Sequence, residues 1–349
     1  MPDTLSSEAP TTTMLGESPA FLDLLEHASR VAAVNKPVLV IGERGTGKEL
    51  IAARLHYLSP RWQAPLVKLN CATLTEALLE TELFGHEAGA FTGATRRHVG
   101  RFEQAHGGTL FLDELATVST RVQEKILRAV EYGQFERVGG GETLTVDVRI
   151  VGATSGDLPA AVRAGTFRAD LLDRLAFDVL TVPPLRARAG DIMQLAEHFA
   201  VDISRELGRK LFAGFTGSAR MALIHYAWPG NVRELKNVVE RSVHRSAAAA
   251  PVDTIVFDPF ASAFRPPAEA VADDVAAPPA EESIPLPCDI KAQVAILEVD
   301  LIRRALAEAR YNQTEAAPLL GLSYHQLRAL LRKHGMVKSR GSHDGSATA

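Results

Sequence analysis

Cysteine is scarce in this chain of 349 residues, which contains only Cys71 and Cys288. Two cysteines so far apart give neither a disulfide framework nor the spacing of a metal site, and such low usage is typical of a reducing compartment. Long apolar runs are also missing, because no stretch approaches the ~18 residues of a membrane span and residues 1–14 lack the apolar core of a signal peptide. We therefore expect a cytoplasmic protein that does not insert into a membrane.

An excess of one charge is missing as well, since 38 basic and 42 acidic residues leave a net charge of −4. That balance does not indicate a histone-like or a membrane-surface protein. Locally the charges separate: residues 258–290 contain seven acidic residues and one basic residue, whereas residues 291–340 contain nine basic and four acidic residues. An acidic linker before a basic module predicts nucleic-acid binding at the C-terminal end.

Short apolar runs alternate with helical patterns in the first half of the chain. Four of these runs predict buried parallel strands: residues 37–41, 66–70, 109–113 and 148–154. The alternation predicts a doubly wound α/β fold that binds ligands at the carboxyl ends of its strands. After Pro183 and Pro184 the strand patterns stop, and three helical patterns predict a small lid: residues 191–207, 218–227 and 232–246.

Composition divides the chain into six segments, and the sequence has no internal repeat. The segments are a disordered leader (1–14), an α/β subdomain (15–183), a helical lid (184–257), an acidic linker rich in Pro and Ala (258–290), a helical DNA-binding module (291–338) and a disordered tail (339–349).

Residues 42–48, Gly-Glu-Arg-Gly-Thr-Gly-Lys, fit the phosphate-binding pattern G-x-x-x-x-G-K between a predicted strand and a predicted helix. The backbone N–H groups of such a loop cradle phosphate oxygens, and Lys48 adds a positive charge at the β- and γ-phosphates. Glu49 replaces the Ser or Thr that usually ligates Mg²⁺, so the metal must depend on water and on acids elsewhere. The predicted ATP-binding residues are Gly42, Glu43, Arg44, Gly45, Thr46, Gly47, Lys48 and Glu49. The alternative is a Gly-rich turn before a helix.

Asp113 and Glu114 follow directly on the third predicted strand. In this position Asp113 would hold Mg²⁺ directly or through water, and Glu114 would orient and deprotonate the attacking water. Asn70, at the end of the second strand, could hydrogen-bond Glu114 and hold its carboxylate out of the catalytic position until a ligand acts. Asn70 could equally well be a strand-end Asn without this role. The alternative for Asp113 and Glu114 is a solvated acidic turn.

Three arginines are candidates for contacts with phosphate. Arg168 and Arg174 are six residues apart and do not share a helical face, so one or both could reach across a subunit boundary to a γ-phosphate. Surface salt bridges explain this pair equally well. Arg233 follows Asn231, which can cap a helix whose first turn aims Arg233 inward as a phosphate-sensing residue of the lid.

Residues 89–94 predict a small flexible loop with one apolar tip. They are Gly89, Ala90, Phe91, Thr92, Gly93 and Ala94. Glycine and alanine bury little, and none of these side chains does acid–base chemistry. A loop of this kind between nucleotide-binding elements is suited to touching a partner under nucleotide control. The alternative is a Gly-rich surface turn without a role.

The C-terminal module is predicted to contain three helices, residues 292–309, 312–320 and 324–333, with Gly321 in the turn and Ser323 as the third helix's cap. Inward-facing positions on the third helix are Leu327, Leu330 and Leu331. Candidate DNA-binding residues on the rest of that helix are Tyr324, His325, Arg328, Arg332 and Lys333. Pro318 is expected near the first turn of the second helix, where a missing N–H is tolerated. A small dimerisation bundle is the alternative.

Together these motifs resemble the sigma-54 activators, the bacterial enhancer-binding proteins. The matching strings are residues 42–49, 82–87, 89–94, 107–114, 167–171 and 228–235. The resemblance covers residues 15–246 and the C-terminal module, and Glu49 is normal in this family. It implies an AAA+ P-loop domain, with a parallel sheet and a helical lid, followed by an all-α Fis-like helix-turn-helix. It further implies an ATPase that works as a homo-hexameric ring.

The resemblance also implies roles for residues around the nucleotide. Arg168 and Arg174 would act on the nucleotide of the neighbouring subunit. Arg233 would be the second sensor of the phosphate and Thr154 the first. The family often has Asn at the next position, where this chain has Ser155, which changes the hydrogen-bond relay from the γ-phosphate.

Two further roles concern the switch and the loops. Asn70 would be the switch for Glu114. Phe91 and Thr92 would contact sigma-54 in its RNA polymerase complex, and Arg137, in a second loop, would support them.

Most members of the family carry an N-terminal sensory domain, whereas the AAA+ pattern starts almost at once here. We therefore expect no receiver or ligand-binding module, and control in trans by another chain or by abundance. Members that activate phage-shock genes are held inactive by a separate inhibitor protein of the PspA type. Trp62 is a candidate contact for such an inhibitor, and a Trp packed against its own domain fits equally well.

We therefore expect an activator that binds enhancer DNA, hydrolyses ATP and remodels the closed complex of sigma-54 RNA polymerase. A different AAA+ machine, such as an unfoldase or a replication initiator, would lack the string at residues 89–94. A DNA-binding regulator without catalysis would not need an intact set of Lys48, Asp113 and Glu114. A P-loop metabolic kinase is a more distant alternative, because the sequence offers no acceptor site.

Overall fold

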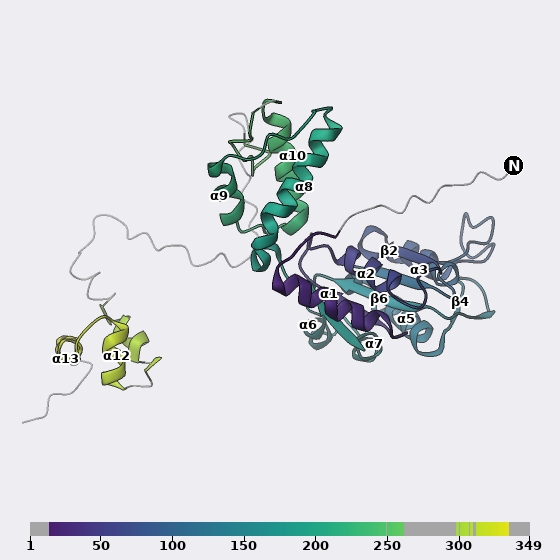
Figure 1. Cartoon of the computed structure of the whole chain (residues 1–349). Coiled ribbons are helices and arrows are strands. Elements are labelled where there is room, and N and C mark those ends of the chain that lie inside the picture. The colour runs from purple at the N-terminus through teal and green to yellow at the C-terminus, as the bar shows by residue number, and fades with distance from the viewer. Residues whose placement is uncertain are drawn as a thin grey trace, which may run out of the picture. The chain divides into compact units, whose positions relative to one another are not determined.

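The computed structural model describes residues 14–248, 250–261, 298–299, 301–306, 308–309 and 312–334 (Figure 1). The predicted leader, linker and tail therefore lie wholly or mostly outside the described residues. The chain divides into two compact units, residues 1–265 and 266–349.

A five-stranded parallel sheet forms the centre of the first unit, in the order β2-β3-β6-β1-β7. Its strands are β1 (Val38–Ile41), β2 (Leu66–Asn70), β3 (Thr109–Asp113), β6 (Arg149–Thr154) and β7 (Asp178–Thr181). The first four lie where the apolar runs predict strands. The pattern does not predict β7, because on this edge strand only Leu180 is buried, while Val179 and the preceding Phe177 are exposed.

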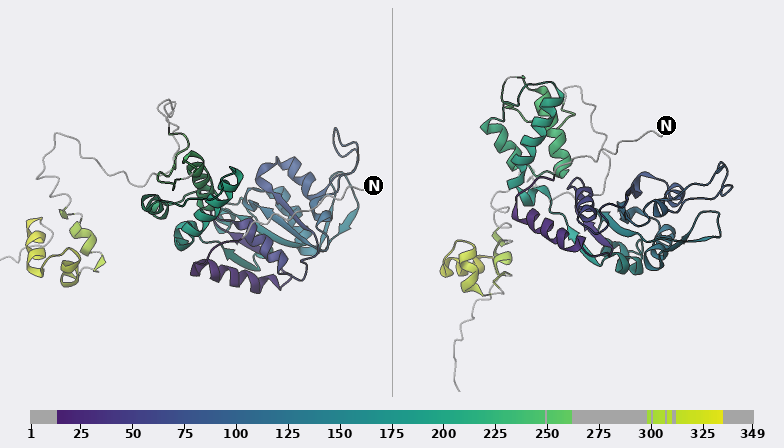
Figure 2. Two further views of the ribbon diagram at one scale, coloured as in Figure 1. Left: turned by 45° about the horizontal axis from the view of Figure 1, so that its top comes forward. Right: turned by 45° about the vertical axis from the view of Figure 1, so that its right-hand side comes forward.

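Helices cover both faces of this sheet (Figure 2), because successive side chains of a strand point to opposite faces. In β1, Val38 and Val40 pack against one set of helices and Leu39 against the other. The helices of the first face are α1 (Pro19–Ala32) and α2 (Lys48–Tyr57). Those of the second face are α3 (Glu76–Phe84), α4 (Arg101–Gln104), α5 (Thr120–Tyr132), α6 (Leu158–Arg163) and α7 (Ala169–Leu175). The predicted doubly wound α/β fold is confirmed.

Two loops leave the body of the subdomain close to each other. The first connects α3 to α4, and an antiparallel bridge between His86 and His98 closes its base. The second connects the short strands β4 (Gln134–Glu136) and β5 (Thr143–Thr145), which form an antiparallel hairpin. The sequence pattern does not predict this hairpin, because each strand has three residues and Phe135 is the one buried side chain among the six.

The lid is a bundle of three helices, α8 (Gly190–Glu206), α9 (Gly217–His225) and α10 (Asn231–Arg245), close to their predicted bounds (Figure 1). Its core surrounds Trp228, which is fully buried and donates from Nε1 to the carbonyl of Leu223 at 2.8 Å. At the start of α8, the carboxylate of Asp191 accepts hydrogen bonds from the backbone N–H groups of Glu17 and Ser18, both at 2.8 Å. These bonds attach the N-terminal end of α1 to the lid.

The second unit contains the predicted helical module. Residues 298–299, 301–306 and 308 are helical, and α12 (Gln313–Leu319) and α13 (Tyr324–Lys333) follow. The side chains of its small apolar core are Ile302, Ala305, Leu306, Ala309, Ala316, Ala317, Leu327 and Leu331. Ser323 caps α13 as predicted, in a reciprocal pair of hydrogen bonds with Gln326. The predicted helical residues 292–297 lie outside the described part.

Pro318 lies in the last turn of α12, so its predicted place near the first turn is wrong. The helix has only seven residues and ends directly after the proline. Gly321, with φ 65°, then reverses the chain, and the N–H of Leu322 donates to the carbonyl of Ala317 at 3.0 Å. The proline therefore removes one bond from a helix that is already ending.

Candidate nucleotide site and contact loops

The predicted phosphate loop connects β1 to α2. Lys48, the first residue of α2, is buried, and its Nζ donates to the carbonyls of Gly42 at 2.8 Å and Glu43 at 3.3 Å. Burial lowers the pKa of Lys48, and the nearby carboxylates of Glu114 and Asp113 oppose this. The loop, the lysine and the two predicted acids thus form one site.

Asp113 is the last residue of β3, and its partial burial raises the pKa of its carboxyl. Its Oδ2 accepts a hydrogen bond from Nδ2 of Asn70 at 3.3 Å. The predicted bond from Asn70 to Glu114 is therefore wrong in this structure. The reason is the strand register, since Asn70 of β2 is aligned with Asp113 of β3 and its side chain lies beside that residue.

Glu114 leaves the strand with a left-handed backbone, at φ 51° and ψ 44°. A non-glycine residue in this region is uncommon, and such strain clusters at functional sites. Its carboxylate accepts a hydrogen bond from the Ser155 hydroxyl at 3.0 Å and lies 3.9 Å from Nε of Arg44. Thr154, the predicted first sensor, is buried at the end of β6 and aligned with Ile41, directly before the phosphate loop.

The donor set fits a magnesium ion that keeps most of its water. No cluster of three or more His, Cys, Asp or Glu side chains able to hold a metal occurs within the described residues. Mg²⁺ needs only one or two carboxylates when phosphates and water complete its shell, and Asp113 supplies such a carboxylate. Glu49 is exposed and ion-paired with Lys68 at 2.9 Å.

Two arginines of the lid hold the phosphate loop. Both belong to a short turn, η3 (Leu185–Arg188). Arg186 pairs with the carboxylate of Glu43 through both terminal nitrogens, with Nη1 at 2.8 Å from Oε2. The buried Arg188 donates to the carbonyl of Thr46 at 3.1 Å. Neither arginine is predicted from the sequence. The signal that the sequence offers is that both follow closely on Pro183 and Pro184.

Asn231 is the centre of the contacts between the lid and this loop. It is fully buried, with a left-handed φ of 53°. Its Oδ1 accepts from the N–H of Leu185 at 2.8 Å, and its Nδ2 donates to the Glu43 carboxylate and the Arg44 carbonyl, both at 3.0 Å. The predicted role of Asn231 as a helix cap is therefore wrong, because α10 begins at Asn231 itself and its side chain binds the loop instead. We call the contacts of Arg186, Arg188 and Asn231 with residues 43–46 the lid latch.

The charge in the lid latch persists to low pH. Hydrogen bonds from Arg186 and Asn231 lower the pKa of Glu43 from 4.5 to about 2. Because this folded-state value lies below the ordinary value, ionised Glu43 stabilises the folded chain above pH 4.5, and this contribution is lost as the pH falls toward 2. The latch is thus fully ionised at neutral pH.

Removing the side chain of Asn231 should loosen the lid. We expect Asn231→Gly to lower the free energy of unfolding by about 1–3 kcal/mol, because the buried N–H of Leu185 loses its acceptor. Asn231→Ala should lower it by about 1–2 kcal/mol more, because alanine disfavours the left-handed backbone that glycine adopts freely. Urea unfolding followed by the fluorescence of buried Trp228 measures both variants. A glycine variant as stable as the wild type would contradict the latch.

Arg233 lies in the first turn of α10, where its N–H and that of Val232 point at the carbonyl of Gly45, at 3.3 and 3.0 Å. Gly45 permits this approach, because a Cβ there would lie 2.3 Å from the carbonyl oxygen of Gly230. The side chain of Arg233 is exposed and has no hydrogen-bond or ion-pair partner among the described residues. With Arg44 it lines a pocket of about 310 Å³.

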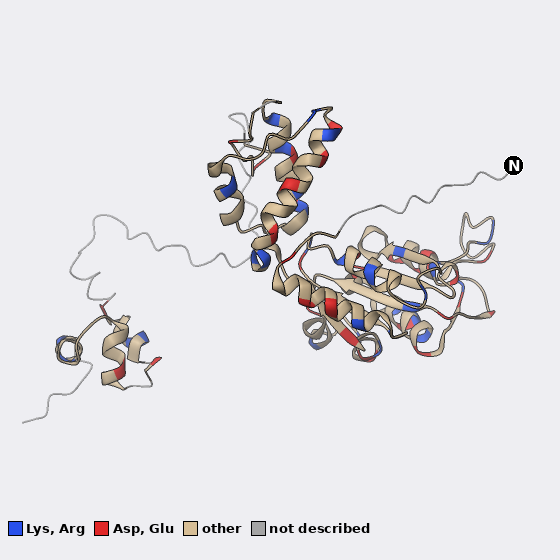
Figure 3. Ribbon diagram, in the orientation of Figure 1, with Lys and Arg blue, Asp and Glu red and all other residues tan. Residues whose placement is uncertain are grey.

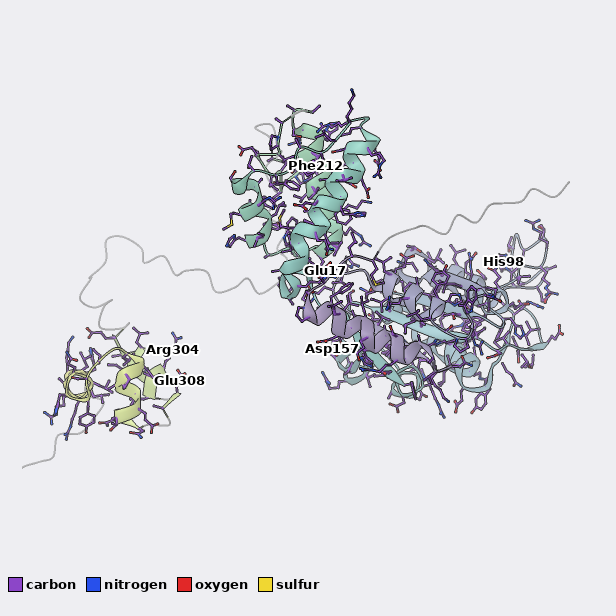
Figure 4. The ribbon with its side chains drawn as sticks, viewed as in Figure 1. Glu17, His98, Asp157, Phe212, Arg304 and Glu308 are labelled. Carbon is purple, nitrogen blue, oxygen red and sulfur yellow. The ribbon has the colours of Figure 1, made fainter. Side chains whose placement is uncertain are left out.

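Residues 89–94, the contact loop, form the outer end of the loop between α3 and α4; Figure 4 labels His98 at its base. Phe91 is 47% exposed, and its ring centre lies 4.9 Å from that of His86. The N–H of Gly89 donates to the carbonyl of Ala94 at 2.7 Å and closes the turn. Thr92 is exposed, so the tip presents one apolar ring and one hydroxyl to solvent.

Arg137, in the second loop, binds two carboxylates that flank the contact loop in the chain. Its side chain is only 4% exposed, and it donates from Nη2 to Glu103 and from Nη1 to Glu87, both at 2.6 Å. The hydrogen bonds to Glu103 and Glu87 raise the pKa of Arg137. Gly139 packs so tightly on Ala90 that a Cβ there would lie 2.5 Å from the Ala90 Cβ. The base of the contact loop is thus held firmly while its tip stays exposed.

Comparisons with known proteins agree with this arrangement. Residues 14–181 match the sigma-54 interaction domain, residues 186–268 the AAA+ ATPase lid domain, and residues 293–334 the Fis family of bacterial regulatory proteins. The Psp operon transcriptional activator of Escherichia coli (strain K12) is 59% identical over 323 residues, which is 92% of this chain and 97% of the relative. The chain belongs to the family of sigma-54-dependent activators.

Two further proteins are similar over most of this chain. The Nif-specific regulatory protein of Azotobacter vinelandii is 45% identical over 90% of this chain and 57% of its own length. A structure of NtrX from Brucella abortus in complex with ATP has a TM-score of 0.65 and 33% identity, and covers 93% of this chain and 70% of its own. The predicted family, the AAA+ P-loop fold with its lid and the Fis-type helix-turn-helix are confirmed.

The two predicted trans-acting arginines of this activator lie at the ends of α7. Arg168 directly precedes the helix and pairs with Asp170 at 2.7 Å. Arg174, in its last turn, is more than half exposed and pairs with Glu131. Within a single chain both side chains therefore form surface salt bridges, and both are accessible.

The activator exposes Trp62 rather than packing it. Trp62 is 55% exposed, and Tyr57 and Leu58 nearby in the chain are exposed as well. The preceding Arg61 anchors this segment by donating to the carboxylate of Asp147 at 2.7 Å.

Among the described helices, none is both long and apolar enough to cross a membrane.

In the DNA-binding module, α13 buries the predicted apolar face and exposes the predicted polar one. Leu327 and Leu331 are buried and Leu330 is partly buried against the same core. Every predicted DNA-binding side chain is exposed: Tyr324, His325, Arg328, Arg332 and Lys333. Lys333 pairs with Glu298 at 2.8 Å, whereas Arg328 and Arg332 have no acidic partner in the described part of the chain. Figure 3 colours the Lys and Arg residues of the described helices blue.

Proposed function

We propose that this chain binds enhancer DNA and uses ATP hydrolysis to convert the closed complex of sigma-54 RNA polymerase into the open complex. The observation that carries the proposal is one subdomain with both a nucleotide site and an exposed apolar loop tip. Lys48, Asp113 and Glu114 form the site, and Phe91 and Thr92 form the tip. A phage-shock operon is the proposed target, on the strength of the identity to the Psp operon activator.

The proposed reaction is attack of water on the γ-phosphate of ATP. Phosphate binding would draw Lys48 from the loop carbonyls that it contacts here to the β- and γ-phosphates. Asp113 would hold Mg²⁺, which neutralises phosphate charge when bound. Glu114 would take the proton of the attacking water, and Thr154 and Arg233 would sense the γ-phosphate from the sheet and from the lid.

A homo-hexameric ring would complete each site with arginines of the neighbouring subunit. Arg174 is exposed and Arg168 is partly exposed, and the side chain of each is bound to a carboxylate of its own chain. Neither guanidinium has to leave a buried site to exchange that partner for a γ-phosphate. A guanidinium supplied in this way stabilises the charge of the transition state.

The two ends of the chain would bind different macromolecules. Phe91 and Thr92 offer sigma-54 a ring and a hydroxyl on a loop whose base is fixed. Arg328 and His325 would read base edges in the major groove, while Arg332 and Lys333 would bind phosphates.

Control would come from a separate inhibitor protein of the PspA type. The exposed Trp62, beside the exposed Tyr57 and Leu58, offers such a partner an apolar contact on a loop that Arg61 holds in place. We propose that the protein acts in the cytoplasm, where both DNA and RNA polymerase are found.

Transcription in vitro from a sigma-54 promoter tests this proposal. We expect the purified chain with sigma-54 polymerase to open the promoter with ATP but not with a non-hydrolysable analogue, because binding alone does not supply the energy of remodelling. Promoter opening without nucleotide would overturn the proposal. ATP turnover without promoter opening would favour another kind of AAA+ machine, and DNA binding without turnover would favour a non-catalytic regulator.

A further inference from the structure

Gln123, on α5, is a polar side chain that is completely buried, with an exposed fraction of 0%. Glutamine is seldom buried in this way unless protein groups satisfy its amide. Here Nε2 donates to the carbonyls of Val118 at 2.7 Å and of Thr166 at 3.0 Å, and Oε1 accepts from the N–H of Arg168 at 2.8 Å. Both ends of the amide are therefore bonded, and two of the three bonds hold the segment that ends at Arg168.

These two bonds fix the backbone from which Arg168 projects. Residues 166–168 lead into α7, and Phe167 is buried in the core cluster that α5 and α7 share. The two N–H groups that precede Arg168 donate to the carbonyl of Ala161 on α6, at 3.0 and 3.2 Å. The side chain of Arg168 pairs with Asp170, only two residues further on. The direction of the guanidinium thus depends on a backbone that α5 and α6 hold in place.

The same helix contacts the other end of α7. Glu131, in the last turn of α5, accepts a hydrogen bond from Arg174, in the last turn of α7. That ion pair lies on the surface, where the guanidinium can exchange its partner. The bonds of Gln123 are made to backbone groups instead, so they can persist when the Arg168 side chain changes partner.

We propose that Gln123 is the positioning residue for Arg168, and that it serves the nucleotide site of the neighbouring subunit rather than its own. The inference rests on the proposed function, in which Arg168 meets a γ-phosphate across a subunit boundary. Such a guanidinium acts only where the charge of the transition state develops, and a small misplacement loses much of its effect. Val118, the third partner of Gln123, lies four residues after Glu114, so the test has to separate an effect on the neighbour from an effect within the same subunit.

Steady-state ATP hydrolysis by the full chain is the first measurement. Gln123→Met keeps the length of the side chain and removes both polar ends. We expect kcat to fall about tenfold, a fraction of the 10³–10⁵ that an arginine supplied in trans contributes, with the affinity for a fluorescent ATP analogue unchanged. Gln194→Met, the same change at a partly exposed position on α8, should keep kcat within about twofold. If Gln123→Met does not fold, Gln123→Asn, which keeps the amide on a shorter side chain, takes its place.

Mixed rings then show which site has lost activity. Glu114→Gln subunits lack their own base but keep Gln123 and Arg168, so they can serve a neighbour. In an equimolar random mixture, about half of the Gln123→Met subunits have such a neighbour. The reference is wild type mixed with Glu114→Gln, and relative to it the turnover should rise from about one tenth to about one half.

A deficit as large in mixed rings as in Gln123→Met alone, or wild-type kcat for Gln123→Met, would overturn the inference while the proposed ATPase function stands. Arg168→Ala, mixed in the same way, is the positive control, because it removes the guanidinium itself. If its deficit also persisted in mixed rings, the proposed role of Arg168 in trans would fail, and the inference with it. A wild-type chain that did not hydrolyse ATP would refute the proposed function before either variant is compared.

Discussion

Glu114→Gln should bind ATP but hydrolyse it about 10²–10⁴ times more slowly than the wild-type chain, because an amide cannot accept the proton of the attacking water. Glutamine has the size of glutamate, and its amide oxygen can still accept the hydrogen bond that the Ser155 hydroxyl donates to Glu114. The loss should therefore be chemical rather than structural. Phosphate release measures the turnover, and a fluorescent ATP analogue measures the affinity.

A matched Glu→Gln change elsewhere provides the control for this experiment. Glu26 lies on α1 and pairs with Arg30 on the surface, with both side chains more than two-thirds exposed. Glu26→Gln should keep turnover within about twofold, as expected of surface substitutions. If Glu114→Gln hydrolysed ATP at the wild-type rate, another group would have to be the base. If it lost ATP binding as well, Glu114 would have a different role in the site.

The parts of the sheet that could be predicted are those whose burial leaves a pattern in the sequence. β1 and β3 are buried on both faces and appear as continuous apolar runs. β7 is an edge strand with one buried residue, Leu180. The strands β4 and β5 of the hairpin have three residues each, which is too short to show a repeating pattern of apolar residues. Burial on one side, or over three residues, does not distinguish a strand from a loop.

The nucleotide site could be located from the sequence, but the partners of its side chains could not. Motif order places the phosphate loop and Asp113 together, because parallel strands end at one edge of the sheet. Whether Asn70 meets Asp113 or Glu114 depends on the register of β2 against β3, which no local pattern specifies. Asn231 shows the same limit, since its partners belong to a loop 187 and 188 residues earlier in the chain.

The contact loop has a fixed base and an exposed tip. Its anchors are buried or ion-paired, with Arg137 bound to Glu87 and Glu103 below the turn. Phe91 and Thr92 lie beyond these anchors and are exposed. Changes at the tip should therefore leave the loop base and the nucleotide site unaltered, so that any lost activity reports a lost partner contact.

Phe91→Ala should consequently uncouple the two activities of the chain. We expect ATP turnover to stay within about twofold of wild type, as for other surface changes. Promoter opening should fall by about 30-fold or more, because an aromatic anchor in an interface contributes at least ~2 kcal/mol. Thr92→Ala should have the same pattern, as the hydroxyl has no role in hydrolysis. Parallel assays of phosphate release and of transcription from a sigma-54 promoter give both numbers.

Phe260→Ala is the matched control, because this phenylalanine is 69% exposed and lies outside both the contact loop and the nucleotide site. It should keep both activities, which would show that loss of an exposed ring is not harmful in itself. Equal loss of hydrolysis and promoter opening in Phe91→Ala would mean that the tip supports the ATPase rather than a partner. Full retention of promoter opening would remove Phe91 from the contact with sigma-54, and the exposed ring would then need another explanation.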